Sequence, residues 1–117
     1  GPEADLHLYH VDDDPAHGFV YRALVRQPGV VVLEEWGLHR LVHAETAGRG
    51  DLGAYLREAR RAHGEMGTFV ARQVVRGLGG DLPALLTMND RVLEASLGLV
   101  AASEAVRARA AARLPAR

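Results

Sequence analysis

The feature that most constrains the fold is an unbroken apolar run at Val30 to Leu33, with the sequence VVVL. A short continuous run of β-branched residues is typical of a strand covered on both faces, as in a parallel sheet. Upstream, Leu6 to Val11 (LHLYHV) predicts a second strand, and Pro15 to Gln27 predicts a helix with Asp14 as its N-cap. Strand, helix and strand in this order predict a right-handed βαβ unit.

The rest of the chain is predicted to be mainly helical, with one further strand. Within positions 34–47 we expect a short helix that contains Leu38, Leu41 and Val42. Further helices are expected at about 52–63, 68–78 and 90–96, so that positions 37–95 are mostly helical, and Gly64 and Gly67 are expected to interrupt this segment. The run LGLVAA at 97–102 predicts a third strand, and Ser103 is expected to cap a helix that ends near Leu114. We therefore expect an α/β, Rossmann-like fold with about three parallel strands, near 6–11, 30–34 and 97–102, and a helical insert between the second and third.

Composition narrows the possible classes of partner and compartment. The 117 residues suffice for one small domain, and the net charge of -1 gives no basis for binding nucleic acid. The absence of cysteine excludes disulfides and thiolate metal sites, and we expect a cytoplasmic protein. No apolar run approaches the roughly 20 residues of a transmembrane segment. Gly1-Pro2 is interpreted as a possible tag remnant. The chain contains neither Lys nor Ile, so every formal cation besides His is Arg, and this bias suggests a GC-rich bacterial genome.

Two long segments resemble a known family. These are LYHVDDDPAHGFVYRALVRQPGVVVLEEWGLHRLV at positions 8–42 and MNDRVLEASLGLVAASEAVRARAAARL at positions 88–114. In motif order and spacing they resemble the N-terminal, acceptor-side domain of family 4 glycosyltransferases. The resemblance implies a GT-B enzyme, in which two Rossmann-like domains face a cleft and the second binds a nucleotide-sugar donor. On this interpretation positions 1–117 form one partial domain, the C-terminal donor-binding domain is missing, and the chain alone is inactive.

The resemblance also implies which residues line the acceptor cleft. In open parallel sheets ligands bind beyond the carboxyl ends of the strands. The expected cleft residues follow the three predicted strands and are Asp13, Asp14, His17, Glu34, Glu35, His39, Arg40 and Ser103. Family members usually carry a His where this chain has Glu34, and an ionised Glu only accepts hydrogen bonds whereas a neutral His also donates one. We therefore assign no catalytic residue.

Simpler interpretations accompany several of these residues. Helix capping and compensation of the helix macrodipole alone would explain Asp12 to Asp14. Glu35, His39 and His43 are spaced by four and could share a helix face that binds a metal, but a solvated polar face is favoured and we expect no metal.

Other functions stay open. One is a non-catalytic interaction protein derived from a glycosyltransferase, which the change to Glu34 favours. A less favoured one is a degenerate receiver-like domain, because the acidic end of the first strand resembles receivers but the required Lys is absent. We also expect the isolated chain to self-associate through exposed sheet edges.

Overall fold

The three predicted strands form one parallel sheet. The computed structural model describes residues 6–113, and its strands are β1 (Leu8–Val11), β2 (Gly29–Leu33) and β3 (Ser96–Ala101), in the order β1-β2-β3. This confirms the expected α/β class and the parallel three-stranded sheet. The suggested tag remnant at positions 1–2 and the predicted helix end at position 114 lie outside the described residues.

Helices occupy most of the remaining described chain. The α-helices are α1 (Gly18–Arg26), α2 (His39–Glu45), α3 (Leu52–Val75), α4 (Asp90–Ala95) and α5 (Glu104–Arg113). Three short 3₁₀ segments are η1 (Pro15–His17), η2 (Ala47–Arg49) and η3 (Leu82–Leu85). The insert between β2 and β3 is helical, as predicted. None of the helices in residues 6–113 has the length and apolar character that crossing a membrane requires.

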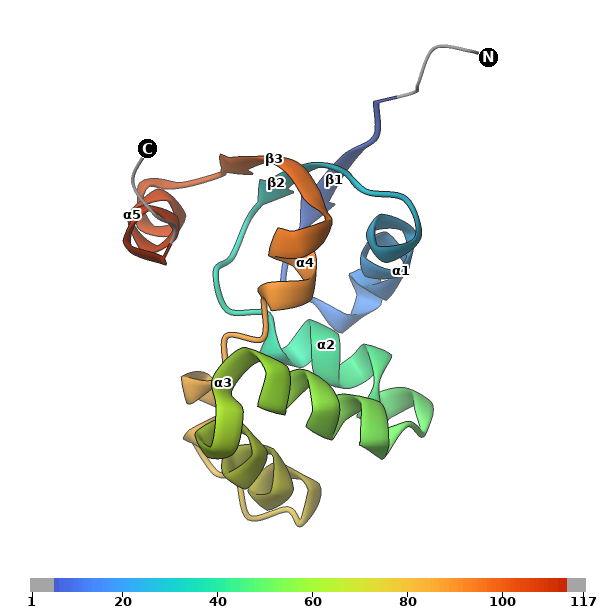
Figure 1. The fold of residues 1–117 in the computed structure, drawn as a ribbon, viewed down its shortest axis with the longest axis vertical. Helices are drawn as coiled ribbons and strands as arrows, with labels where there is room; N and C mark the ends of the chain where they lie inside the picture. The colour runs from blue at the N-terminus through green and yellow to red at the C-terminus, as the bar shows by residue number, and fades with distance from the viewer. Residues whose placement is uncertain (1–5, 114–117) are drawn as a thin grey trace.

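Chain direction explains why the helices gather on one side of the sheet. Both crossovers, β1 to β2 and β2 to β3, advance the same way across the sheet. Right-handed crossovers that advance in one direction place their helices on one face. In Figure 1, α1, α4 and α5 accordingly lie on one side of the strands. The core sits there, with Val31 and Leu33 of β2 packed against helical residues such as Leu24 and Val92.

The opposite face corrects one prediction. The VVVL run was expected to be covered on both faces, but Val30 and Val32 are only half-buried, whereas Val31 and Leu33 are fully buried. Their neighbours on the adjacent strands, Leu8 and the paired β3 residues, share this exposed face. The prediction was wrong because it was based on the composition of one strand, whereas the direction in which the chain crosses the sheet decides which face the helices cover.

The first helix differs from its prediction in its opening turn. Asp14 is the expected cap, accepting from the backbone N–H of Ala16 at 2.9 Å, but it caps the 3₁₀ turn η1, and α1 begins only at Gly18. A 3₁₀ turn rotates the chain by more per residue than an α-helix. The buried face of α1 therefore carries Tyr21 and Leu24, and Phe19 is 60% exposed.

Gly64 and Gly67 act differently within α3. Gly64 has φ 64° and ψ −143°, a conformation open to glycine, and it bends the helix. Gly67 does not interrupt the helix, contrary to prediction. A Cβ there would overlap the carbonyl oxygen of Ala59 and lie 2.6 Å from the Cβ of His63. Gly67 therefore lets the distal half of α3 pack closely against the proximal half.

Candidate functional site

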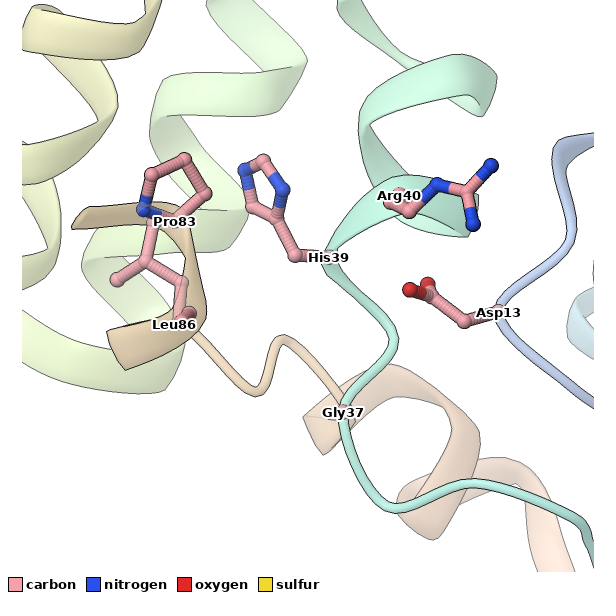
Figure 2. A pocket seen from close by; sticks show the side chains of 7 residues that line it. Asp13, Gly37, His39, Arg40, Pro83 and Leu86 are labelled. Carbon is pink, nitrogen blue, oxygen red and sulfur yellow. The ribbon is translucent and has the colours of Figure 1, made fainter. Parts of the chain in front are cut away.

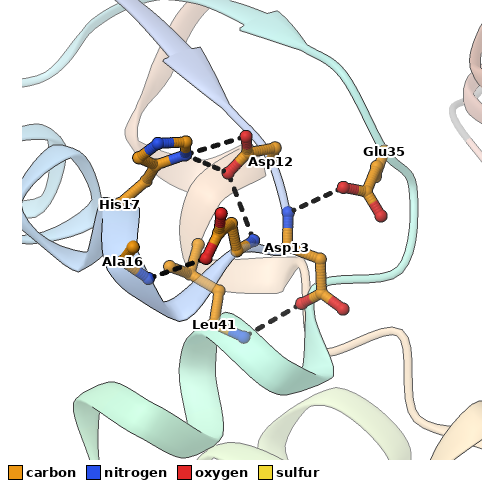
Figure 3. Close-up of polar contacts among 7 residues, drawn as sticks. Asp12, Asp13, Ala16, His17, Glu35 and Leu41 are labelled. Carbon is orange, nitrogen blue, oxygen red and sulfur yellow. Dashed lines mark hydrogen bonds and ion pairs between the residues drawn. The ribbon is translucent and has the colours of Figure 1, made fainter.

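The carboxyl edge of the sheet brings together the loops after β1 and β2. These strands pair in parallel with Val11 opposite Leu33, so the residues that follow are neighbours. The backbone N–H of Asp13 donates to the Glu35 carboxylate at 3.1 Å (Figure 3). The Asp13 carboxylate in turn accepts from the backbone N–H of Leu41 at 2.9 Å. Asp13 thus ties the first loop to both the second loop and the start of α2.

Asp13 also lines a cavity of about 270 Å³, called here the first cavity. Its lining residues are Asp13, Gly37, His39, Arg40, Pro83, Ala84 and Leu86. The charged and imidazole side chains come from the β1 loop and α2, and Pro83 and Leu86 face them from the η3 segment (Figure 2). A few convergent polar groups over an apolar wall are typical of a small-molecule site, and the volume is near the lower end, about 300 Å³, of such sites.

His39 is fixed in this cavity by a buried tyrosine. The His39 Nε2 and Tyr55 Oη atoms are 2.6 Å apart, and Tyr55 is fully buried. Burial, with the nearby His43, lowers the pKa of His39 from 6.5 to about 4, so its imidazole is neutral at pH 7. Burial raises the pKa of Tyr55 to about 12, so the phenol keeps its proton. We infer that the phenol donates to Nε2, which leaves Nδ1–H as the imidazole donor.

Opposite charges share the first cavity beside His39. The Arg40 guanidinium lies on the same side as the Asp13 carboxylate (Figure 2). Burial raises the pKa of Asp13, while its hydrogen bond from Leu41 and the charge of Arg40 oppose that rise. The cavity therefore offers a carboxylate acceptor, a guanidinium donor and a neutral imidazole within one recess.

A second cavity, of about 560 Å³, lies on the other side of the first loop. Its lining residues are His10, Asp12, His17, Phe19, Val20, Glu34 and Glu35. His17 Nδ1 lies 2.9 Å from both carboxylate oxygens of Asp12 (Figure 3), and this hydrogen bond raises the pKa of His17. With three acids among its lining residues, the second cavity is the more acidic of the two.

The eight expected cleft residues fall into three groups. Asp13, His39 and Arg40 line the first cavity. His17, Glu34 and Glu35 line the second. Asp14 and Ser103 line neither and act as helix caps, since the Ser103 hydroxyl accepts from the backbone N–H of Val106 at 3.2 Å.

The proposed polar face of Glu35, His39 and His43 is corrected in part. Helix α2 begins at His39, so Glu35 precedes it and bonds to Asp13 instead. His39 and His43 do share a face, with ring centroids 5.7 Å apart, and both contact Tyr55. Within residues 6–113, no three His, Asp or Glu side chains gather in a way that could hold a metal ion.

Two contributors to the first cavity were missed from sequence. The sequence analysis predicts no element for the η3 segment, although Asp81 followed by Leu82 and Pro83 suits the start of a short helical turn. Tyr55 is buried on α3, but its hydroxyl contact with His39 spans 16 residues and leaves no local signal in the sequence.

Comparison of the chain with protein family models, curated proteins and solved structures found no match.

Proposed function

We propose that this chain is the acceptor-side part of a nucleotide-sugar-dependent glycosyltransferase. The observation that carries the proposal is the first cavity, where Asp13, His39 and Arg40 converge beyond the carboxyl ends of β1 and β2. This is the edge at which parallel α/β sheets bind ligands. A carboxylate that accepts and an imidazole N–H and a guanidinium that donate suit a neutral ligand rich in hydroxyl groups, such as a sugar or another polyol.

The chain alone is proposed to bind an acceptor without transferring a sugar. The family resemblance assigns the nucleotide-sugar donor to a second domain, and the described residues form one three-stranded sheet with its helices. The resemblance also puts a His at the position of Glu34, which lies in the second cavity beside Glu35. A carboxylate there accepts hydrogen bonds but, when ionised, donates none. No catalytic residue is therefore assigned.

The test is a ligand titration followed by NMR amide shifts. The full chain is titrated separately with a panel of monosaccharides and polyols and with nucleotide sugars. Sugar or polyol shifts are expected at residues 37–41 and 84–86, and nucleotide sugars are expected to give none. Arg40→Gln is expected to weaken binding, because Arg40 is exposed and its guanidinium forms no ion pair within the described chain. Arg76→Gln, an exposed arginine at the end of α3, is the matched control.

Two outcomes would contradict the proposal. One is nucleotide-sugar binding or transfer by this chain, which would assign it to the donor side or to a self-sufficient enzyme. The other is equal acceptor binding by the wild type and Arg40→Gln, or shifts that avoid the first cavity.

A second candidate is a non-catalytic interaction protein derived from a glycosyltransferase. Two observations favour it: Glu34 replaces the family His, and one face of the sheet is apolar and exposed. A longer form of the protein that binds a partner but never releases nucleotide from a nucleotide sugar would favour this function over catalysis.

A further inference from the structure

The uncovered face of the sheet has a defined set of residues. Because side chains alternate along a strand, and because Leu8, Val30 and Gly98 pair across the sheet, the same face carries every second residue. We call this the open face. Its described members are Leu8, His10, Val30, Val32, Gly98 and Val100. Leu8 is 60% exposed and Val100 is 50% exposed, whereas Tyr9, Leu99 and Ala101 on the opposite face pack against the core.

The open face is large enough to matter for association. Together with the exposed Leu6 and Leu97 that flank it, it presents on the order of 500 Å² of mostly apolar surface, near the upper limit for a monomer. A stable protein–protein interface buries about 800 Å² on each partner, so this surface, with Leu6 and Leu97 included, supplies more than half of one side of such an interface. The members of the open face include no Asp, Glu, Arg or Lys, so two copies of this face meet without charge repulsion.

The shape of the open face fits the same face of a second copy. The row of paired residues Leu8, Val30 and Gly98 runs from a protruding side chain through an intermediate one to none. The space above Gly98 is open, since a Cβ placed there would meet only the Val30 Cγ2 atom, at 3.8 Å. A two-fold axis parallel to β2 exchanges the two ends of this row. It would set each Leu8 over the hollow at Gly98 of the other copy.

We propose that a second copy of this chain covers the open face, with the two sheets packed face to face and β1 of each copy over β3 of the other. The contact is isologous, because the same patch serves both copies. Sheets packed in this way lie about 10 Å apart, a distance that interdigitating Leu and Val side chains fill. Self-association thus uses the face of the sheet, in addition to any pairing at its edges. This proposal does not depend on the proposed function.

The test measures self-association of the full chain by sedimentation equilibrium over a wide concentration range. The wild type is expected to dimerise. Gly98→Val is expected to weaken dimerisation at least tenfold, because the new side chain fills the hollow that Leu8 needs. The monomer should keep its fold, since the site is spacious and Val suits a strand. Circular dichroism and thermal unfolding check this.

Three further variants make the result specific. Leu8→Lys is expected to abolish dimerisation by placing a charge in the contact. Phe69→Lys is the matched control, because Phe69 is also 60% exposed but lies on α3, away from the sheet, and it should leave dimerisation unchanged. The double variant Leu8→Ala, Gly98→Val exchanges protrusion and hollow, and it is expected to dimerise more tightly than Gly98→Val alone.

Several results would overturn the proposal. One is a monomer at all concentrations, which would mean that further elements of a longer polypeptide, or another protein, cover the open face. Another is a dimer that Gly98→Val and Leu8→Lys leave as strong as the wild type. A third is a dimer that Phe69→Lys disrupts as much as Leu8→Lys does. If Gly98→Val failed to fold, a comparison of the dimerisation of Leu8→Lys with that of Phe69→Lys would still test the proposal.

Discussion

Acidification should destabilise this protein through His39 in particular. Burial lowers the pKa of His39 in the folded chain from 6.5 to about 4. Between these two values the unfolded chain binds a proton at this residue and the folded chain does not. The free energy of unfolding therefore rises with pH in this window and falls as the pH drops from 6.5 towards 4. The contribution of His39 is fully present above pH 6.5.

The magnitude follows from the same two values. A difference of one pKa unit corresponds to about 1.4 kcal/mol, so the gap between 6.5 and about 4 sets an upper limit of roughly 3 kcal/mol. His39 lines the first cavity and is only partly buried, so solvent screens part of this effect. We expect the loss on full acidification to be about 1–2 kcal/mol.

The assay compares urea unfolding of the wild type and His39→Gln, followed by circular dichroism at several pH values from 7 to 4 and at one protein concentration. Gln does not titrate, and its side-chain amide can reach the position of Nε2 and accept from the Tyr55 hydroxyl. Asp13 and His63, whose pKa values are raised and lowered respectively, remain in both proteins. The difference between the two curves therefore isolates His39.

The wild type should lose about 1–2 kcal/mol more than the variant between pH 7 and pH 4. Two parallel curves would refute the reasoning, because they would mean that His39 titrates alike in the folded and unfolded chains.

Substitutions at three further positions probe the fold and the first cavity. Gly67→Ala should lower the free energy of unfolding by about 2 kcal/mol or more in urea denaturation, because the new Cβ overlaps the Ala59 carbonyl oxygen. Gly64→Ala should lower it by about 1–3 kcal/mol through strain alone, since the space beside Gly64 is open but its φ is 64°. Asp13→Ala should lower it by about 1–2 kcal/mol, as measured by thermal and urea unfolding, because the Leu41 N–H loses its acceptor; Asp13→Asn should lower it by less.

The parts of the fold that were predicted from sequence depend on neighbours in the chain. The strand at LHLYHV, the VVVL run and LGLVAA were located to within one or two residues, because a run of β-branched or aliphatic residues needs only itself to be recognised. The caps at Asp14 and Ser103 were also found, since each bonds to a backbone N–H two or three residues ahead.

The open face could not be predicted from the strand alone. VVVL indicates that both faces of β2 avoid water, and nothing local states which elements cover them. In the structure both crossovers advance in one direction and stack their helices on a single face. Val30 and Val32 keep the apolar character of a doubly covered strand while only one face is covered. That mismatch between composition and coverage is the basis for proposing a second copy there.

One side of the first cavity could be predicted from the sequence, and the opposite side could not. Asp13, His39 and Arg40 follow strands whose carboxyl ends meet, and a general rule for parallel sheets brings them together. The opposite wall, from Pro83 to Leu86, comes from a turn that is about 40 residues further along the chain than α2. In Figure 1 the second half of α3 lies further from the sheet than the first half, and the segment that follows α3 returns the chain to η3. No periodicity in the sequence encodes that return.

The second cavity shares a residue with the open face, and the first cavity shares none. Ligand binding in the first cavity should therefore be independent of self-association. His10 belongs to the open face and also lines the second cavity, so a second copy on that face would alter the second cavity. The first cavity is built from α2 and η3 together with Asp13, and none of its lining residues belongs to the open face. A ligand in the first cavity should therefore bind with the same affinity to the wild type and to monomeric Leu8→Lys. NMR titrations of both proteins at matched concentration would measure this. An affinity that followed the oligomeric state would mean that the ligand occupies the second cavity or bridges the two copies.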